Sequence, residues 1–367
     1  MKIVIVTNPL PKTNLSPVVS LSKLIQILPS DCSITLLGAG YSETQFSRTN
    51  RPIEVPVLPS ISGGKISRFL KSLKIQKTIG EMILNSKPDI VLFWIADKMV
   101  TPLKICRKHK IPSVFWILFS YPYMKSLPGF KNKIALCLLK DMAYKADRCA
   151  VEARGVAEDW PELWKKRKDV PAILPIFADQ RYYSFQKPYL SRGYNVCVVS
   201  RLASEKNILN IIEGFRFFNE QQKNLWHLHL IGDGPQRNEV LEAAAKAGGS
   251  VTVHGWVSAE EINDLLNDSR VFISASKTEG LPSSLQEAML CGVPAIVTPV
   301  GGMRSIVTDR QNGWVLKGFS SQDVADGLNS FAHETNQESF SRQSVATIKE
   351  GYSVEACRLK MSAFLKK

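Results

Sequence analysis

Short apolar runs alternate with longer amphipathic stretches throughout the first half of the chain. The apolar runs predict strands at residues 3–6, 33–37, 90–93, 113–118 and 148–151. Between them, apolar residues recur with the period of a helix at 18–28, 65–84, 100–109 and 134–144. Strands that alternate with helices are typical of a parallel sheet with helices on both faces, so we expect an α/β, doubly wound domain here.

A second series of the same kind starts near residue 194. Its expected strands are 194–200, 225–231, 251–254, 271–274 and 295–298, with a turn at 312–314 that leads into 315–316. Residues 354–365 have the pattern of a final helix. With 367 residues the chain exceeds one ordinary hydrophobic core, and we expect two domains.

The stretch 271–302 is predicted as strand, glycine turn, helix, glycine turn and strand. Pro282 and the two serines that follow it suit the first turn of the helix, and Gly292 is expected to end the helix. The N–H groups from Gly280 to Ser284 and the positive end of the helix dipole favour an anion such as phosphate at this point.

Two carboxylates accompany this turn. Glu279 lies in it, and Glu287 follows eight positions later, about one turn into the helix. A carboxylate beside a phosphate site can accept hydrogen bonds from ribose hydroxyls, as acidic residues do in dinucleotide-binding folds. The alternative is an ordinary crossover between two strands, in which Glu279 is solvated and Glu287 caps the helix.

These residues resemble the signature of retaining glycosyltransferases with the GT-B fold, the glycosyl transferases group 1 that are often called family 4. The resemblance rests on EGLP at 279–282, EAM at 287–289, GVP at 292–294, SRLASEK at 200–206, IGDGP at 231–235 and HGWV at 254–257. It implies two Rossmann-like domains that face a cleft. They would be an acceptor domain at 1–178, a linker at 179–192, a donor domain at 193–350 and a C-terminal helix at 351–367 that returns to the first domain.

The resemblance also implies roles for single residues. Arg201 and Lys206 would bind the pyrophosphate of the donor, since Arg offers a bidentate fork and Lys a point charge; the alternative for both is a solvated surface cation. Glu287 would hold the ribose. Glu279 would face the transferred sugar, with a positioning and electrostatic role and not that of a nucleophile. The expected catalytic residues are therefore Glu279, Arg201 and Lys206.

The donor-binding set that the resemblance implies is larger than the catalytic set. It comprises Arg201, Lys206, Val257, Glu279, Gly280, Leu281, Pro282, Ser283, Ser284 and Glu287. Val257 would border the nucleobase, while Gly232 and Gly234 would permit a tight turn beside the cleft. No Asp-x-Asp occurs in the chain, although such paired aspartates typically hold a diphosphate through a divalent metal. We expect no metal and no cofactor, with a nucleotide-diphosphate sugar as the substrate.

Two features of the first half depart from the family pattern. Family members commonly carry glycines in the loop after the first strand, but residues 7–14 contain none. The loop is therefore expected to shape the acceptor site without contacting the donor. Many relatives place a histidine after the strand at 113–118, and none is present here. Ser120, Tyr121 and Tyr123 are open to two interpretations, as polar contacts at the site or as loop and core residues.

The net charge of +14 is concentrated in the first half. Residues 1–180 hold 27 Lys and Arg against 14 Asp and Glu, whereas the rest of the chain holds 20 against 19. An anionic partner of the first half is expected, and a membrane surface, a lipid-linked phosphate or a nucleic acid would fit. The resemblance favours the membrane, because the first domain in the family often touches it.

Two basic stretches carry much of this charge. The predicted helix at 65–84 has an apolar face surrounded by lysines and an arginine. It is either a helix that lies on an anionic membrane or a crossover helix with a solvated basic face. The second stretch, at 164–168, includes Trp164 and follows Trp160, and both rings are expected to be available at an interface.

Cysteine usage and hydropathy point to a reducing compartment. The seven cysteines show neither a CxxC pair nor paired histidine spacing, so we expect buried thiols. Residues 1–6 are interpreted as a strand and not as part of a signal peptide. No apolar run reaches the roughly 18 residues that a transmembrane helix needs. The expected location is cytoplasmic and peripheral at the inner membrane face.

The function that these observations predict is sugar transfer by a hexosyltransferase-type, metal-independent enzyme. The donor would be a UDP- or GDP-sugar, and the acceptor a glycan or lipid-linked molecule in cell-surface polysaccharide or glycolipid synthesis. An alternative is a sugar-nucleotide epimerase or hydrolase on the same fold. A basic nucleic-acid-binding protein is disfavoured because no recognition motif is present, and a dehydrogenase because no GxGxxG follows Val6.

Overall fold

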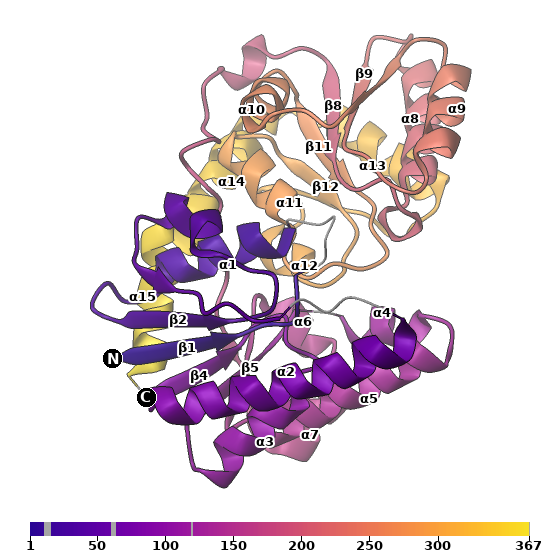
Figure 1. Cartoon of the computed structure of the whole chain (residues 1–367). Coiled ribbons are helices and arrows are strands. Elements are labelled where there is room, and N and C mark those ends of the chain that lie inside the picture. The colour runs from indigo at the N-terminus through magenta and orange to yellow at the C-terminus, as the bar shows by residue number, and fades with distance from the viewer. Residues whose placement is uncertain (11–15, 60–63, 119, 367) are drawn as a thin grey trace. The chain divides into compact units, whose positions relative to one another are not determined.

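The computed structural model describes residues 1–10, 16–59, 64–118 and 120–366. The chain divides into two compact units. The first unit contains residues 1–152, 156–176 and the C-terminal segment from Cys357, and the second contains 153–155 and 177–356. Both are parallel α/β structures (Figure 1), as the alternating pattern predicts.

The first unit is built on a parallel sheet with the strand order β3-β2-β1-β4-β5-β6-β7. Its strands are β1 Lys2–Val6, β2 Ser33–Leu37, β3 Ile53–Glu54, β4 Ile90–Phe93, β5 Ser113–Ile117, β6 Arg148–Val151 and β7 Ala172–Ile173. The five longer strands were predicted with bounds that agree within one residue. The edge strands β3 and β7 have two residues each, which is too short for a recognisable alternation.

Helices cover both faces of this sheet, with α1 and α15 on one face and α2, α3 and α5 on the other (Figure 1). The helical elements are α1 Ser16–Ile27, η1 Glu43–Thr49, α2 Lys65–Ser86, α3 Val100–Lys108, α4 Tyr121–Ser126, α5 Phe130–Lys145, α6 Arg154–Glu158, α7 Pro161–Arg167 and α15 Val354–Leu365. Within this unit, Arg148 donates to the carbonyl of Phe364 (2.8 Å), and Arg358 donates to the carbonyl of Gln26 (3.2 Å). The described residues of α15 from Cys357 onward are thus a packed part of the first unit.

The second unit contains a parallel sheet with the order β10-β9-β8-β11-β12-β13. Its strands are β8 Asn195–Val199, β9 His227–Ile231, β10 Val251–Gly255, β11 Val271–Ser274, β12 Ala295–Val297 and β13 Gly313–Val315. The expectation of a turn at 312–314 is wrong for Gly313 and Trp314. These two residues pair with β12 as the first residues of β13. The buried Asn312 forms the turn instead, since its side chain bonds the N–H of Thr308 and the carbonyl of Ile306.

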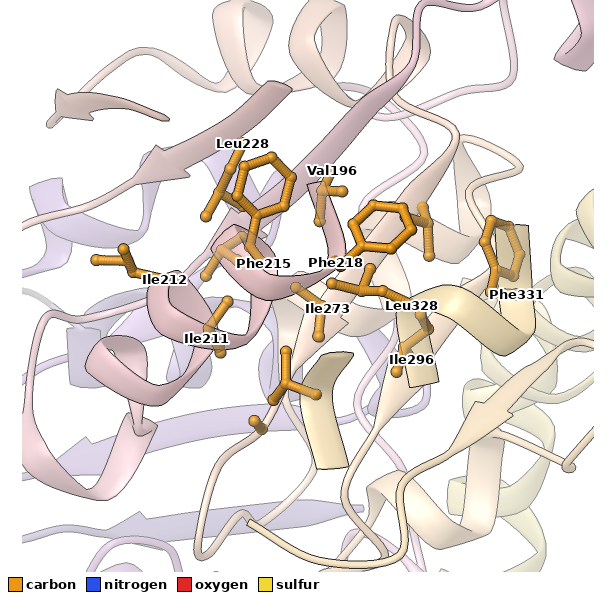
Figure 2. Packing of buried hydrophobic residues seen from close by; sticks show 14 of the residues in the cluster. Val196, Ile211, Ile212, Phe215, Phe218, Leu228, Ile273, Ile296, Leu328 and Phe331 are labelled. Atoms are coloured by element: carbon orange, nitrogen blue, oxygen red, sulfur yellow. The ribbon is translucent and has the colours of Figure 1, made fainter. Parts of the chain in front are cut away.

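The helices of the second unit enclose its core. They are η2 Tyr189–Ser191, η3 Ser204–Lys206, α8 Ile208–Gln221, α9 Arg237–Lys246, α10 Ala259–Asn267, α11 Ser283–Leu290, α12 Met303–Ile306, α13 Ser321–Ala332 and α14 Gln337–Tyr352. Figure 2 shows Phe215 and Phe218 of α8 among the apolar side chains of the sheet and of α13. Gly214 lets α8 and α13 approach, because a Cβ there would lie 2.4 Å from the carbonyl oxygen of Ser321.

The segment expected as a linker, 179–192, is packed into the second unit. Tyr189 belongs to its hydrophobic core. Arg192 is buried, and its guanidinium donates to the carbonyls of Lys187, Ser269, Cys291 and Gly292. Burial lowers the pKa of Arg192 to about 10. The residues that lead into the second sheet therefore fix the end of α11.

Each sheet has one point where the strand order reverses, between β1 and β4 in the first unit and between β8 and β11 in the second. In open parallel α/β sheets, ligands bind outside the carboxyl ends of the two strands that flank such a switch point. The loops after β1, β4, β8 and β11 are therefore expected to carry a ligand site.

The cysteines and the helices bear on the expected compartment. Six of the seven cysteines are buried, as predicted, whereas Cys137 on α5 is exposed. All seven are free thiols. In residues 1–10, 16–59, 64–118 and 120–366, no helix combines the length and the apolar character that spanning a bilayer requires.

Candidate functional site

The turn between β11 and α11 has the predicted design. Pro282 is the residue before the helix, and it offers no side chain to cap the first N–H groups. Gly292 lies just beyond the helix with φ of 71°, a conformation that favours glycine. The helix start therefore presents uncapped N–H groups beside the carboxyl end of β11, an arrangement suited to an anion.

The loop after β12 supports this turn from behind. The N–H of Gly302 donates to the carbonyl of Gly280 over 2.6 Å. A Cβ at Gly301 would lie 1.9 Å from the carbonyl oxygen of Glu279, and Gly301 has φ of 48°. Both positions therefore require glycine, and the backbone of the Glu279 turn has little freedom to shift.

Lys206 and Glu279, two of the three expected catalytic residues, form an ion pair at the β8/β11 switch point. The Nζ atom of Lys206 lies 2.6 Å from Oε1 of Glu279, and the two side chains are 21% and 11% exposed. The N–H of Lys277 donates to the carbonyl of Glu205 over 2.8 Å, which joins the two loops through the backbone. The alternative in which Lys206 and Glu279 are solvated independently is wrong.

Arg201, the third expected catalytic residue, has a different partner. Its guanidinium pairs with Glu205, four residues later, and its side chain is 60% exposed. Both cations expected to bind phosphate are thus already neutralised by a carboxylate. An incoming diphosphate would have to compete with Glu205 and Glu279 for them.

Glu287 lies in the middle of α11, so it does not cap the helix as the alternative interpretation supposed. It shares a side-chain hydrogen bond with Tyr183, a residue of the segment expected as a linker. Burial first, and then the negative charge of Glu287, raise the pKa of the Tyr183 hydroxyl. The sequence pattern did not single out Tyr183, because one tyrosine in an irregular segment carries no periodic signal.

The other expected donor-binding residues are distributed around the same turn, with one exception. Leu281 is buried, Ser284 is half-buried and Ser283 is exposed at the start of α11. Val257 follows β10, which is separated from β8 by β9. Among the hydrogen bonds and ion pairs of the described residues, none joins Val257 to the Lys206–Glu279 pair.

Gly232 and Gly234 have the structural role that was expected. A Cβ at Gly232 would lie 2.0 Å from the carbonyl oxygen of Ser200, and one at Gly234 would lie 2.4 Å from that of Leu202. The loop after β9 is therefore pressed against the loop after β8, which carries Arg201. The two glycines therefore allow this close approach of the loops.

A polar cluster lies at the β1/β4 switch point of the first unit. The side-chain amide of Asn8 donates to Oδ1 of Asp97 over 2.5 Å, and the N–H of Asn8 donates to the carbonyl of Ile95. Ile95 has φ of 49°, which is strained for a β-branched residue and therefore a pointer to function. Nearby, the indoles of Trp94 and Trp116 pack 4.7 Å apart, and neither Nε1 has a hydrogen-bond partner within the described part of the chain.

The positions after β5 divide between the two interpretations left open by the sequence. The ring of Tyr121 packs 5.0 Å from that of Trp160, and Ser120 is buried, so both follow the loop-and-core interpretation. The side chain of Tyr123 and part of the loop at 7–14 lie outside the described residues.

The two basic stretches differ in the structure. In α2, Leu70 and Leu73 are 59% and 44% exposed, whereas Ile75 and Ile79 further along the helix are buried. The first half of this helix therefore leaves apolar side chains in solvent. In the second stretch, Trp160 is buried and the indole of Trp164 donates to the carbonyl of Ala157 (2.7 Å). The expectation that both rings are available at an interface is wrong.

No metal site emerges from residues 1–10, 16–59, 64–118 and 120–366. Within these ranges, no group of three or more His, Cys, Asp or Glu side chains is placed to hold an ion. The cations and the helix start at the β8/β11 switch point are the groups that fit an anionic ligand directly.

Residues 183–347 match the family model of the glycosyl transferases group 1. This range contains all the expected donor-binding residues. An uncharacterized glycosyltransferase of Methanocaldococcus jannaschii is 27% identical over 221 residues, which are 56% of this chain and 55% of that protein. A putative teichuronic acid biosynthesis glycosyltransferase of Bacillus subtilis is 29% identical over 136 residues, 37% of this chain and 32% of the relative. The chain thus aligns with about half or less of these relatives.

The likeness to solved structures extends over the whole chain. The Anabaena protein HepE, in complex with UDP and glucose, has a TM-score of 0.77 and 17% sequence identity, with 100% of this chain and 99% of that chain covered. This confirms the predicted fold class, in which two parallel sheets are flanked by helices. The protein therefore has the α/β, two-domain GT-B fold of glycosyltransferases, and its residues 183–347 match the glycosyl transferases group 1.

Proposed function

We propose that the protein is a retaining, metal-independent hexosyltransferase of the family 4 type that uses a UDP- or GDP-sugar. The observation that carries this proposal is the Lys206–Glu279 pair beside the uncapped start of α11. A cation and a helix N-terminus suit a diphosphate, and a carboxylate suits sugar hydroxyls. The bound UDP and glucose of HepE support the same class of donor.

In this proposal, Lys206 and the N–H groups of α11 stabilise the charge that grows on the leaving diphosphate, with Arg201 as a second cation. Stabilisation of developing charge by preorganised groups is usually the largest contribution to catalysis. The acceptor hydroxyl attacks the anomeric carbon from the face that the diphosphate leaves. Because attack and departure occur on the same face, the sugar keeps its configuration. The proton of the acceptor hydroxyl passes to an oxygen of the departing phosphate. Glu279 orients a sugar hydroxyl and takes no covalent part.

We place the acceptor on the first unit, at the β1/β4 switch point. The Asn8–Asp97 pair offers an amide and a carboxylate, which are groups that bind hydroxyl-rich ligands, and the strained Ile95 in the loop after β4 accepts a hydrogen bond from the N–H of Asn8. The acceptor is a glycan or a lipid-linked molecule at the inner membrane face. The Bacillus subtilis relative, named for teichuronic acid biosynthesis, supports a role in polysaccharide synthesis.

The membrane contact in this proposal is the first half of α2. Residues 55–80 contain five Lys and Arg and no Asp or Glu. Leu70 and Leu73 are exposed among Lys71, Lys74 and Lys77. An apolar stripe within a basic helix surface suits a bilayer with anionic lipids, because burial of leucine adds to electrostatic attraction.

The first experiment is a thermal-shift screen with UDP, GDP, ADP and their common sugar conjugates, with and without EDTA. We expect a shift with one nucleotide series that EDTA leaves unchanged, since ligands that bind only the folded state raise its stability. The donor found in this way is then incubated with glycan and lipid-linked acceptors, and the anomeric configuration of the product is read by NMR. An inverted anomer, or loss of donor binding in EDTA, would contradict the proposal.

The same incubations separate the alternatives. Release of free sugar or a change in the sugar itself without transfer to any acceptor would indicate a hydrolase or an epimerase. Tight DNA binding that weakens with salt, without any nucleotide-sugar binding, would indicate the nucleic-acid alternative.

A further inference from the structure

We propose that Ser276 is the positioning residue that keeps the carboxylate of Glu279 in place when Lys206 turns to the diphosphate of the donor. The proposal rests on the function proposed above. It concerns how Glu279 stays oriented at the moment when its ion-pair partner is needed elsewhere. In this proposal, Ser276 acts only through Glu279.

One oxygen of Glu279 receives both of its described hydrogen bonds. Oε1 lies 2.6 Å from Nζ of Lys206 and accepts a hydrogen bond of 2.7 Å from the Ser276 hydroxyl. Oε2 has no partner among the described residues. The carboxylate is thus held through one oxygen, and the other is left for a hydroxyl of the transferred sugar.

Ser276 is itself held firmly. Its side chain is buried, with only 2% of the residue exposed. Its carbonyl accepts a hydrogen bond of 2.6 Å from the hydroxyl of Thr298, a fully buried residue that directly follows β12. The position of the serine is therefore fixed by the sheet and does not depend on the ligand.

The direction of the hydrogen bonds follows from chemistry. An ionised carboxylate can only accept, so the single hydroxyl hydrogen of Ser276 points to Glu279. The hydroxyl of Ser274 lies 3.2 Å from that of Ser276, and it must then be the donor in that pair. The hydroxyls of Ser274 and Ser276 thus form a chain of two donors that ends on the acceptor Oε1 of Glu279, and hydrogen bonds in such chains strengthen one another.

Lys206 and Ser276, the two partners of Glu279, should respond differently when a donor binds. Lys206 carries a flexible ammonium that a diphosphate attracts, because the diphosphate has more negative charge than one carboxylate. Ser276 is buried and tied to Thr298, so it stays. In the donor-bound state, the hydroxyl of Ser276 is therefore the contact that keeps Glu279 aimed at the sugar.

The test compares Ser276→Ala with Lys206→Ala in the whole 367-residue chain. We expect Ser276→Ala to lower kcat for sugar transfer by about 10- to 100-fold, the range for a lost hydrogen bond to a charged group. Its Kd for the free nucleoside diphosphate should stay within about twofold of wild type. Lys206→Ala should instead weaken binding of the nucleoside diphosphate. An unchanged kcat in Ser276→Ala, or a loss of nucleotide affinity equal to that of Lys206→Ala, overturns the proposal.

Ser344→Ala is the matched control. Ser344 is fully buried in the same unit, and its hydroxyl donates to the carbonyl of Asn312 (2.9 Å). It measures the effect of deleting a buried serine hydroxyl far from Glu279. A kcat loss in Ser344→Ala as large as that in Ser276→Ala would assign the effect to stability and contradict a positioning role.

A second measurement does not depend on sugar transfer. In crystals of Lys206→Ala, we expect the Glu279 carboxylate to remain hydrogen-bonded to Ser276, and in Lys206→Ala/Ser276→Ala to adopt another rotamer. An unmoved carboxylate in the double variant would overturn the role of Ser276. If wild type transfers no sugar from any donor, the proposed function fails, and these crystals still decide whether Ser276 holds Glu279.

Discussion

Lys206 Nζ and Glu279 Oε1 lie 2.6 Å apart, although 73 positions separate the two residues in the sequence. The contact joins the loops after β8 and β11, the two strands at which the order of the second sheet reverses. Its physical meaning is that the ligand-free site is electrically balanced. Under the proposed function, a diphosphate would have to compete with Glu279 for Lys206.

Replacement of the two cations should therefore have unequal effects. We expect Lys206→Ala to lower kcat/KM. The loss should correspond to about 2–4 kcal/mol of transition-state stabilisation, by analogy with the loss of an oxyanion donor. Arg201→Ala should lower kcat/KM less, because the Arg201 side chain is 60% exposed and its guanidinium is ion-paired with Glu205. Arg216→Ala is the control, since Arg216 forms the same kind of exposed pair with Glu220 on α8. Near-normal turnover in Lys206→Ala would refute a phosphate-binding role.

Glu287 and Tyr183 can be separated by substitution. Glu287→Ala should weaken nucleotide binding if the carboxylate holds the ribose. Tyr183→Phe removes only the hydroxyl that bonds Glu287, and we expect it to lower the free energy of unfolding by about 1 kcal/mol. Isothermal titration calorimetry measures the affinity for the nucleotide, and urea unfolding measures the free energy of unfolding. Unchanged nucleotide affinity in Glu287→Ala would leave this residue with the structural contact to Tyr183 alone.

Gly301 offers a test of how closely the β12 loop supports the site. Gly301→Ala combines a positive φ with a Cβ 1.9 Å from the Glu279 carbonyl. Gly248→Ala is the matched control, because Gly248 has φ of 65° with nothing within 4 Å of its Cβ. In both variants, the strained backbone should lower the free energy of unfolding by about 1 kcal/mol or more. We expect Gly301→Ala alone to impair nucleotide binding in a thermal-shift titration. Equal binding by the two variants would show that the turn tolerates displacement.

The histidines of β9 and β10 make stability depend on pH. His229 Nδ1 and His254 Nε2 lie 3.0 Å apart, and the rings of His227 and His229 are 4.7 Å apart. Burial first, and then the neighbouring imidazoles, lower the pKa of His229 to about 4, while Asp268 opposes the shift. Burial also lowers the pKa values of His227 and His254.

The sign of this effect follows from the folded pKa being below the unfolded value of about 6.5. The stabilisation is complete above about pH 6.5 and is lost as the pH falls toward about 4, because protons then favour the unfolded chain. Urea unfolding of wild type and His229→Gln between pH 7.5 and 4.5 measures it. We expect a smaller loss of stability in the variant; parallel curves would show that other groups dominate the acid response.

Liposome binding tests the exposed leucines of α2. We expect Leu70→Ser/Leu73→Ser to reduce sedimentation with vesicles that contain phosphatidylglycerol, without changing nucleotide binding. Leu225→Ser in the second unit is the control, because Leu225 is 58% exposed and Leu70 is 59% exposed. Replacement of Lys71, Lys74 and Lys77 should reduce binding further, and this part should depend on salt. Unchanged sedimentation of the leucine variant would move the contact away from α2.

Much of this architecture was predictable because burial on both sides of a parallel strand leaves a continuous apolar run. The strand Val271–Ser274, the helix start at Ser283 and the stop at Gly292 follow from such local rules. The short strands β3 and β7 form only because neighbouring strands pair with them, so their sequence carries no comparable signal.

The residues proposed for the candidate site could be named from the sequence, whereas the contacts between them could not. The spacing of Glu279 and Glu287 pointed to a ligand, but their partners Ser276 and Tyr183 did not stand out in the sequence. A hydroxyl that bonds a carboxylate across a turn depends on how the loop closes, which no periodic pattern encodes. The exposure of Leu70 could not be predicted either, because an amphipathic helix has the same sequence pattern whether or not other residues cover its apolar face.

The packing of the last helix has a consequence for synthesis on the ribosome. Residues from Cys357 onward belong to the first unit, and Arg358 and Phe364 are tied to α1 and β6. The second unit, 177–356 with 153–155, can therefore be complete while the first still lacks one of its helices. Although domains generally fold from the N-terminus during translation, here the unit that begins first is finished last.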